Sequence, residues 1–342
     1  MKTKQKIKNL IIIFSIMLVV TLTCVFHSGW HPFFLNKFAE KFNVVSSHDN
    51  VLVHFIDVGQ GDASAVNFPN GQIMLIDTGS VQTNTSYVNY LKENVLNTQR
   101  GNYIDYLVLT HADMDHCGGT MKLLSNFKIG KIFLPLLESN SQGYQEILNY
   151  VQTNCDYEIL GDEFDLKISN SIVTFFEIIN DANTNDSSQI IKLQSLNKCF
   201  LFSGDISKEV EADYIDRYGD LLDVDVLKVS HHGSKTATSK AFLNVTSPDY
   251  AVISAGLNNI YGHPSAEVLQ ILAENDVSVL RTDICDDILF IVGKHYDLYQ
   301  TSGLFHITQL SLDYVVFVLS IDACLILASI IIVVKKEKKN KK

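Results

Sequence analysis

Basic residues are scarce in the long middle part of this 342-residue chain. The whole chain has 27 lysines and arginines against 38 aspartates and glutamates, but ten of the lysines and one glutamate lie at the two ends. Residues 9–334 therefore carry 17 basic and 37 acidic side chains, a formal charge of −20. A surface with that balance repels polyphosphates at a distance. The charge thus weakens any interpretation as a general nucleic-acid platform.

Cysteine is also sparse, and the chain contains neither internal repeats nor low-complexity segments apart from a lysine-rich tail. Two of the six cysteines lie in apolar terminal runs, and the spacing of the other four shows no dense disulfide framework. Residues 48–310 are long enough to bury a sizeable core without disulfide bonds. We therefore expect one large domain that is stabilised by packing.

Two long apolar runs, residues 10–27 and 313–334, lie at the ends of the chain. Lysine-rich segments flank them, residues 1–9 before the first and 335–342 after the second. Runs of this length predict two membrane spans in a lipid bilayer. Flanking lysines stay in the cytoplasm, which predicts a two-pass cell-membrane protein with both termini inside and its middle outside. Asp322 interrupts the second run, and a carboxylate there is expected either to be protonated or to face a partner helix.

A cleaved signal peptide is the alternative reading of the first run, but no A-x-A-like cleavage site follows it. We therefore favour an uncleaved anchor, with residues 28–47 as a linker. The domain that follows begins with strands and then alternates strands with helices. Period-two alternation and short apolar runs predict the strands, and 3.6-residue periodicity predicts the helices. The predicted strands are Val51–Val58, Ala63–Phe68, Gln72–Ile76, Ile104–Leu109, Lys131–Leu134, Ser171–Ile178, Lys198–Ser203, Val224–Ser230, Tyr250–Ser254 and Val277–Arg281.

Helical patterns occur between these strands, so we expect helices on the outside of two facing sheets. The predicted helices or helical turns are Val88–Leu96, Cys117–Phe127, Tyr144–Val151, Ser207–Tyr218, Lys240–Val245 and Ala266–Asn275.

The segment THADMDHCGG, residues 110–119, packs two histidines and two aspartates into six residues directly after an apolar strand. These groups would be costly beside a buried strand unless a cation neutralises the carboxylates and uses the imidazoles. The H-x-D-x-D-H spacing can give His111 and Asp113 to one ion. Asp115 and His116 can then bind a neighbouring ion. We interpret the segment as a metal site rather than a solvated acidic loop.

Further groups of this chemistry follow later strands. Asp205 ends the segment FLFSGD, where one carboxylate can bridge two cations, although alone it would be an ordinary turn residue. In LKVSHHGS, the consecutive residues His231 and His232 point different ways, so we expect one ligand and one supporting or substrate-contacting residue. His263, in the loop segment YGHP, is either a turn residue or the last ligand.

Three acids of the first strands are candidates for supporting roles. Asp77 ends the segment IMLID, either as a turn or capping residue or as an acid that orients the histidine loop by hydrogen bonds. The loop DVGQGDA begins at Asp57, and its glycines let it bend sharply. It can project Gln60 or Asp62 towards a site at the strand ends.

Seven motifs in unbroken order, between about Val51 and Thr282, resemble the metallo-β-lactamase-fold domain of ComEC-like competence proteins, and more distantly a phosphorylcholine esterase. They are DVGQGDA, IDTG, LTHADMDHCGG, FLFSGDIS, LKVSHHGS, YGHP and RTD. Asp113 stands where the commoner motif has a second histidine, and the strand after Ser171 carries no histidine, a role that the HHG segment supplies in this branch. The additional spans of ComEC-like channels have no counterpart, so DNA uptake does not carry over.

The resemblance implies a four-layer αββα metallo-β-lactamase sandwich flanked by two transmembrane helices, with two divalent cations in its site. By the same resemblance the first cation takes His111, Asp113, Asp205 and His231. The second takes Asp115, His116, Asp205 and His263. Imidazole nitrogens with carboxylate oxygens suit Zn²⁺ and admit Mn²⁺ or Fe.

The resulting hypothesis is an outward-facing, membrane-tethered phosphodiesterase or phosphoesterase. The residues with catalytic roles would be Asp115, Asp205 and His232, and the contacts to phosphate or leaving group would be Ser234, Lys235 and Tyr261. A ComEC-like nuclease acting on DNA is the second hypothesis, which the acidic domain disfavours. A lactamase or thioesterase comes third, because Asp113 departs from the lactamase pattern. A non-catalytic metal-containing binding or signalling module is the alternative from another class, although the complete ligand set argues against it.

Overall fold

The computed structural model describes residues 49–96, 101–294, 296–301 and 304–310. The chain divides into two units: residues 45–293, and residues 1–44 with 294–342. The predicted spans at 10–27 and 313–334, their lysine-rich flanks and the whole of the predicted linker at 28–47 lie outside the described residues. Within the described residues, no helix has both the length and the apolar character needed to cross a bilayer.

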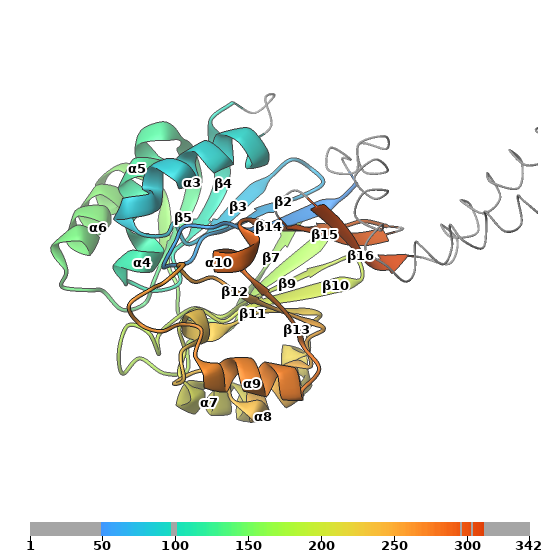
Figure 1. Cartoon of the computed structure of the whole chain (residues 1–342). Coiled ribbons are helices and arrows are strands. Elements are labelled where there is room, and N and C mark those ends of the chain that lie inside the picture. Colours follow the sequence, from blue (N-terminus) through green and yellow to red (C-terminus); the bar gives the residue numbers. More distant parts are fainter. Residues whose placement is uncertain (1–48, 97–100, 295, 302–303, 311–342) are drawn as a thin grey trace, which may run out of the picture. The chain divides into compact units, whose positions relative to one another are not determined.

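The first sheet of the unit 45–293 has the strand order β14-β1-β2-β3-β4-β5-β6 (Figure 1). Its strands are β1 Val51–Phe55, β2 Ser64–Asn67, β3 Ile73–Ile76, β4 Tyr103–Val108, β5 Lys128–Leu134, β6 Tyr157–Ile159 and β14 Ile288–Val292. The strand β1 runs antiparallel to both β14 and β2, whereas β3 to β6 are parallel. Every residue of β1, β3 and β14 is buried, as expected for apolar strands covered on both faces.

The second sheet has the order β13-β12-β11-β10-β9-β8-β7. Its strands are β7 Phe164–Ile168, β8 Ser171–Phe175, β9 Ile191–Ser195, β10 Lys198–Phe202, β11 Val226–Lys228, β12 Tyr250–Ile253 and β13 Ser278–Arg281. The strands β7 to β10 form an antiparallel meander, and β10 to β13 are parallel. Parallel strands align their carboxyl ends, so the loops that follow β10, β11 and β12 leave the sheet at the same edge.

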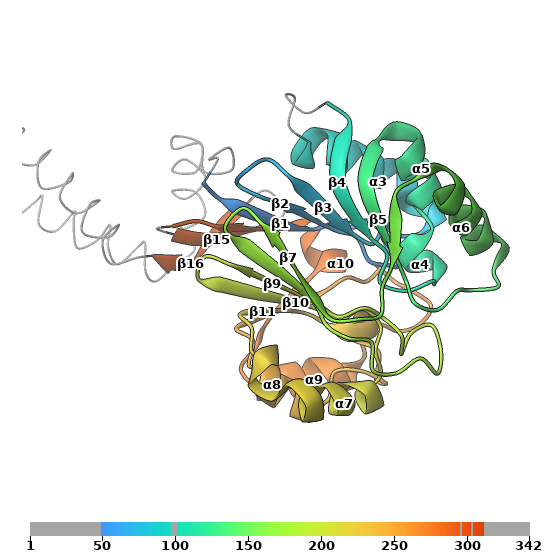
Figure 2. The same ribbon diagram turned by 180° about the vertical axis from the view of Figure 1, so that it is seen from behind.

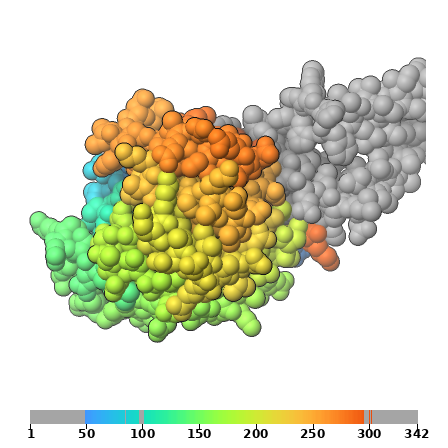
Figure 3. Space-filling view, turned by 90° about the horizontal axis from the view of Figure 1, so that it is seen from below, coloured from blue at the N-terminus to red at the C-terminus, as the bar shows by residue number. Residues whose placement is uncertain are grey.

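Helices cover the outer face of each sheet (Figures 1 and 2). Those over the first sheet are α3 Asn84–Tyr90, which continues into a π-helical turn Leu91–Val95, α4 Met114–Cys117, α5 Thr120–Asn126 and α6 Gln142–Asn154. Those over the second are α7 Lys208–Tyr218, α8 Lys240–Thr246 and α9 Ala266–Glu274, which form much of the face in Figure 3. A short helix, α10 Thr282–Cys285, follows β13. Side-chain caps fix where three helices begin, because Ser141, Ser239 and Ser265 each accept a backbone hydrogen bond from the first turn.

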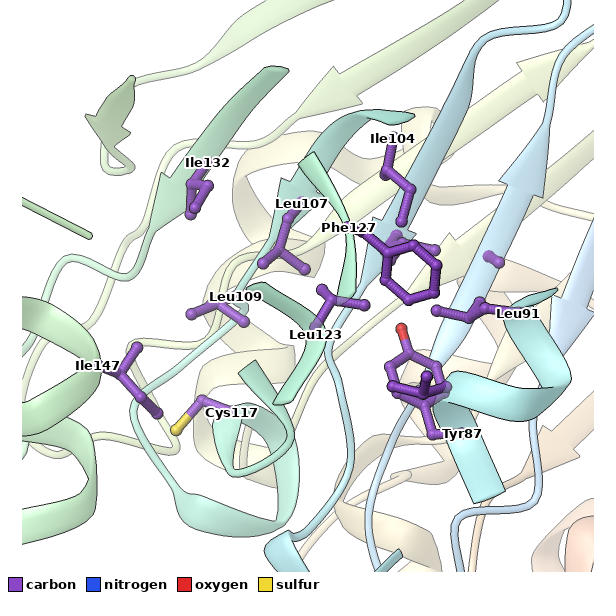
Figure 4. Close-up of a cluster of buried hydrophobic side chains, with 14 of the residues drawn as sticks. Tyr87, Leu91, Ile104, Leu107, Leu109, Cys117, Leu123, Phe127, Ile132 and Ile147 are labelled. Atoms are coloured by element: carbon purple, nitrogen blue, oxygen red, sulfur yellow. The ribbon is translucent and has the colours of Figure 1, made fainter. Parts of the chain in front are cut away.

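The core consists of one layer between the sheets and one under each set of helices. Between the sheets, Phe55 of β1 stacks on Phe202 of β10, and Phe133 of β5 meets Phe175 of β8, at centroid distances of 5.7 and 5.2 Å. Under the first set of helices, a cluster that includes Leu107 and Leu123 is buried (Figure 4). The predicted αββα layering is thus confirmed for this unit.

Most predicted elements are present with boundaries shifted by a few residues. The predicted helix Cys117–Phe127 is two helices, because α4 ends at Gly118-Gly119 and α5 begins after them. The sequence analysis missed β6, β7, β9 and β14. In the other unit, β15 Tyr296–Thr301 and β16 Leu304–Leu310 form an antiparallel hairpin. The four cysteines of the described residues form no disulfide.

Candidate metal centre

The predicted ligands meet where loops from the two sheets face each other. The segment 110–116, a loop that leads into α4, follows β4 of the first sheet. In the second sheet, the segment after β10 supplies Asp205, and the segment after β11 supplies His231 and His232. Loops at the carboxyl ends of parallel strands are the usual location of binding sites in α/β folds.

Asp205 lies at the centre of the cluster and is 4% exposed. Its Oδ1 is 3.3 Å from His116 Nε2, and its Oδ2 is 3.6 Å from His232 Nε2. The same Oδ2 is 3.9 Å from His111 Nε2 and 3.8 Å from His231 Nε2. One carboxylate therefore faces four imidazoles, and three of the four distances are too long for hydrogen bonds.

The remaining acids of the histidine loop lie at the edge of this cluster. Asp115 Oδ2 is 3.3 Å from His232 Nε2, and Asp113 and Asp115 are both partly exposed. One potential ligand atom from each of four residues lies within 4.8 Å of the others, and these residues are Asp62, His116, Asp205 and His232. The structure therefore brings Asp62, which the sequence suggested as a supporting residue, into the potential ligand shell.

Several buried polar atoms of the cluster have no hydrogen-bond partner. They are His111 Nε2, His116 Nε2, His232 Nε2, Asp62 Oδ1 and Asp205 Oδ1. Buried polar atoms are nearly always satisfied in native proteins, so five at one place require an explanation. Imidazole nitrogens and carboxylate oxygens pointing at a common space are the donor set of a divalent cation. The residues present therefore fit a metal site.

The charges in the cluster are strongly coupled. Burial lowers the pKa of His116, but Asp205, Asp77 and Asp62 outweigh it and raise that pKa well above its usual value. Burial likewise opposes protonation of His232, yet Asp205 and Asp62 raise its pKa to about 10. Burial would raise the pKa of Asp205, but the surrounding imidazoles hold it well below its ordinary range. The metal-free site thus retains protons that a cation would displace.

Asp77 supports the histidine loop from beneath. Its Oδ2 is 2.7 Å from His116 Nδ1 and accepts a hydrogen bond from the Thr110 hydroxyl at the same distance. Its Oδ1 accepts the backbone N–H of Thr110 at 2.8 Å. These contacts favour the orienting role over the simple turn role. The backbone of Asp77 has a φ of 61°, a conformation in which short polar residues are the least strained apart from glycine.

Asp62 and Lys228 form a buried ion pair that supports the second sheet's histidine. Lys228 Nζ is 2.6 Å from Asp62 Oδ2, with side-chain exposures of 3% and 7%. Asp62 Oδ1 is 3.3 Å from His232 Nδ1, an atom that also lies 3.0 Å from the Ser254 carbonyl oxygen. The sequence analysis missed Lys228. The available signal was a single charged residue inside an otherwise apolar strand.

Backbone geometry brings the loops together. Gly61 packs so closely that a Cβ there would lie 2.2 Å from the carbonyl oxygen of Asp115, and the Asp62 N–H donates to that same oxygen at 3.1 Å. Only glycine permits this approach. Both His231 and His232 adopt left-handed conformations, with φ of 49° and 53°. Such strain is typical of functional sites, where the surrounding structure holds it in place.

The other predicted residues are placed as follows. His263 lies beside the cluster, its ring centroid 5.7 Å from that of His231 and 6.4 Å from that of His232. Tyr261 stacks next to it at 5.8 Å and is 64% exposed. Ser234 is buried and pairs with the Thr236 hydroxyl, whereas Lys235 is exposed.

Asp57 performs a local role in the described structure. Its backbone N–H donates to Asp287 Oδ1 at 2.8 Å, and its Oδ1 accepts the N–H of Gly59. These contacts shape the loop that carries Asp62. The predicted supporting role of Asp57 stays a prediction.

A cleft of about 720 Å³ opens beside Asp113 and Asp115. Its other lining residues are Gln60, Ser80, Val81, Gln82, Thr83, Ala112, Met114, Ser139, Ser141 and Tyr261. A cavity of this size can hold a small-molecule substrate next to the ligand cluster.

Comparison with known proteins gives matches over the same region. Residues 56–256 match the model of the metallo-beta-lactamase superfamily. The chain is 34% identical over 247 residues to ComE operon protein 3 of Bacillus subtilis (strain 168), covering 68% of this chain and 32% of that protein. It is 30% identical over 239 residues to Competence protein ComA of Neisseria gonorrhoeae, covering 70% and 32%. The chain spans about a third of the length of these relatives.

Two solved structures also align with the chain. The metallo-beta-lactamase fold protein YhfI from Bacillus subtilis aligns with a TM-score of 0.45 and 12% identity, covering 68% of this chain and 96% of that one. A diphosphatase from the PhnP family aligns with a TM-score of 0.43 and 12% identity, covering 77% and 99%.

Proposed function

Because the chain belongs to the metallo-β-lactamase superfamily, whose members are generally metal-dependent hydrolases, we propose that it is a phosphodiesterase that uses two divalent cations. The observation that carries the proposal is the convergence of four imidazoles on Asp205, three of them with buried Nε2 atoms that lack hydrogen-bond partners. A central carboxylate with two free faces is what a pair of cations requires.

We assign the first cation to the set predicted from the sequence. These residues are His111, Asp113, Asp205 and His231. The Nε2 atoms of His111 and His231 approach one oxygen, Asp205 Oδ2, at 3.9 and 3.8 Å. That geometry supports a shared cation beside this oxygen.

The second cation is assigned to Asp115, His116 and Asp205, together with His232. The Nε2 atom of His232 is buried and lies within 3.6 Å of carboxylate oxygens of both Asp115 and Asp205. The sequence-derived ligand at this position was His263, which lies at the rim beside Tyr261. We therefore place His263 among the substrate contacts, with Tyr261, Ser234 and Lys235.

The donor atoms are nitrogens and carboxylate oxygens, which suit Zn²⁺ and also accommodate Mn²⁺. When bound, the two cations would supply Lewis-acid activation of a phosphoryl group and of water. The protein's part is to fix the ligands. Asp77 holds the Nδ1 side of His116. The Ser254 carbonyl oxygen accepts from Nδ1 of His232, with Asp62 beside the same atom, so both Nε2 atoms point into the cluster. Lys228 balances the charge of Asp62.

A nuclease acting on single-stranded DNA is the second candidate. The observation that favours it is the match to relatives named as competence proteins. The excess of acidic residues argues against it, because a phosphate backbone is bound mainly by lysines and arginines. Tethering outside the membrane by residues 10–27 and 313–334, with a partner helix at Asp322, belongs to the proposal on the strength of the sequence alone.

The test uses the full-length chain, purified without chelators. We expect elemental analysis to find about two metal ions per chain, as a dinuclear site requires. The chain should hydrolyse bis(p-nitrophenyl) phosphate, lose turnover on treatment with EDTA, and regain it with Zn²⁺ or Mn²⁺. Full turnover after verified metal removal, or faster hydrolysis of a β-lactam than of the diester, would refute the proposal. A chain that binds metal but hydrolyses no ester would instead support the alternative of a non-catalytic binding or signalling module.

A further inference from the structure

The cleft beside the ligand cluster is lined almost entirely by uncharged side chains. Hydroxyls come from Ser80, Thr83, Ser139 and Ser141, and amides from Gln60 and Gln82. Apart from Asp113 and Asp115, which we assign to the cations, no described residue that lines the cleft is charged. The described lining residues include no lysine, arginine or histidine.

The charges at the site leave none to spare for a second anionic group. The two divalent cations are opposed by the carboxylates of Asp113, Asp115 and Asp205 and by that of Asp77, which lies 2.7 Å from His116 Nδ1, so four positive charges meet four negative ones. A single phosphodiester anion would bind the cations directly. The nearest buried cation, Lys228, is already paired with Asp62 at 2.6 Å. A second phosphate lying in the cleft would lose water contacts without gaining a cationic partner, which is unfavourable.

The neutral lining suits a particular kind of group. Hydroxyl and amide side chains both donate and accept hydrogen bonds, so they pair well with substrate hydroxyls. Tyr261 is the aromatic residue of that lining, and 64% of its surface is exposed. Aromatic faces pack against the apolar C–H surfaces of otherwise polar rings and chains.

We propose that the substrate is a phosphodiester with a single phosphate, and that its arm in the cleft is an uncharged polyhydroxy group such as a sugar or polyol. This inference rests on the phosphodiesterase function proposed above. It makes Gln60, Gln82 and Tyr261 residues that determine specificity. The proposal also distinguishes this chain from nucleases, whose substrates carry further phosphates on either side of the one that is cleaved.

The experiment compares two substrates with the metal-loaded full-length chain at fixed ionic strength. Glycerophosphoglycerol carries one phosphate between two neutral polyol arms, and a ten-nucleotide oligothymidylate carries phosphates along its whole length. We expect kcat/KM per scissile phosphate to be about tenfold or more higher for glycerophosphoglycerol, the effect of one uncompensated charge contact. Thymidylyl thymidine, with one phosphate and neutral nucleoside arms, should fall between them.

A charge-gain variant tests the cause of that preference. Gln82 is exposed in the cleft, so Gln82→Lys places a cation where a neighbouring phosphate would lie. Relative to the neutral, similarly sized Gln82→Met, it should raise the ratio of oligothymidylate to glycerophosphoglycerol activity by about tenfold. The gain should shrink as salt is increased.

The outcomes distinguish the two proposals. Faster cleavage of oligothymidylate by the unmodified chain, or an unchanged ratio in Gln82→Lys, overturns the inference and leaves the phosphodiesterase function intact. Failure of the metal-loaded chain to cleave any of the three diesters overturns both.

Discussion

The Nδ1 atom of His116 lies 2.7 Å from Oδ2 of Asp77, in a contact that is buried on both sides. A carboxylate in this position fixes the ring and strengthens the opposite nitrogen as a ligand. The role of Asp77 in metal binding can therefore be tested without touching a ligand.

Asp77→Asn should weaken binding of the second cation by about 10- to 100-fold, the usual effect of losing such a partner. Asparagine tolerates the left-handed backbone at this position, so the loop should keep its conformation. Metal titration with turnover as the readout measures the shift, and high metal concentration should restore activity. Asp105→Asn, a buried aspartate that accepts the N–H of Ile73, is the control. Equal metal affinity in Asp77→Asn and the unmodified chain would exclude the orienting role.

Lys228→Met should destabilise the metal-free protein by about 3–5 kcal/mol, because it leaves the buried Asp62 carboxylate without its partner. Adding Asp62→Asn should recover much of that loss, since the uncompensated charge is then gone. Urea denaturation of the single and double variants measures both values.

The chain provides a matched control for this pair. Lys131 and Glu158 are also 2.6 Å apart, but their side chains are 33% and 49% exposed. Lys131→Met should change the free energy of unfolding by no more than about 1 kcal/mol. Similar losses in Lys228→Met and Lys131→Met would mean that the buried pair has no special importance.

Asp205→Ala should lose both metal ions and all turnover, because one carboxylate serves both cations in our assignment.

His232→Ala should lose about one ion per chain, and His263→Ala should retain both but show a raised KM. Elemental analysis and steady-state kinetics distinguish these results. Loss of an ion from His263→Ala with two ions kept in His232→Ala would return the ligand role to His263.

The raised pKa of Asp287 should make the free energy of unfolding depend on pH, independently of metal binding. Burial raises its pKa to about 6, the N–H of Asp57 partly offsets this, and the charges of Asp57 and Asp286 add to it. The folded protein therefore holds a proton more tightly than the unfolded chain. The stability that this proton contributes is present below the unfolded pKa and is lost as the pH rises through about 6.

Asp287→Asn keeps an oxygen that can accept the Asp57 N–H and removes the charge. At pH 8 the variant should be more stable than the unmodified chain by on the order of 1 kcal/mol, after allowance for partial exposure of the site. At pH 4 the difference should disappear. Urea midpoints of the metal-free proteins at the two pH values check this, and a difference that grows towards low pH would reverse the sign.

Most of the elements that were predicted have a continuous or strongly periodic apolar pattern, although the apolar strand β14 was overlooked. Residues Ala266–Asn275 predicted a helix that the structure places at Ala266–Glu274, after a serine cap. The strands β7 and β9 were missed although apolar and polar residues alternate along both, which is the pattern of a half-buried strand. Short polar strands of this kind are stabilised by neighbours in the sheet rather than by their own composition.

At the site, the types of residue and their positions after strands could be predicted from the sequence. The pairs of residues that contact each other could not. The histidine loop and Asp205 follow strands in the sequence, and the structure brings them together. Lys228 could not be predicted as a partner of Asp62, because 166 positions separate the two residues and only the meeting of two sheets pairs them. The separate placements of His231 and His232 depend on left-handed backbone angles that the letters HHG do not specify.

The proposed ligands are divided between the two sheets, with His111 and His116 following a strand of the first and Asp205 and His232 following strands of the second. A chain emerging from the ribosome presents the earlier pair long before the later one. Until then only the first sheet's histidines are available. The proposed ligand set is therefore complete only after both sheets have formed, and a product that ends before Asp205 lacks half of it.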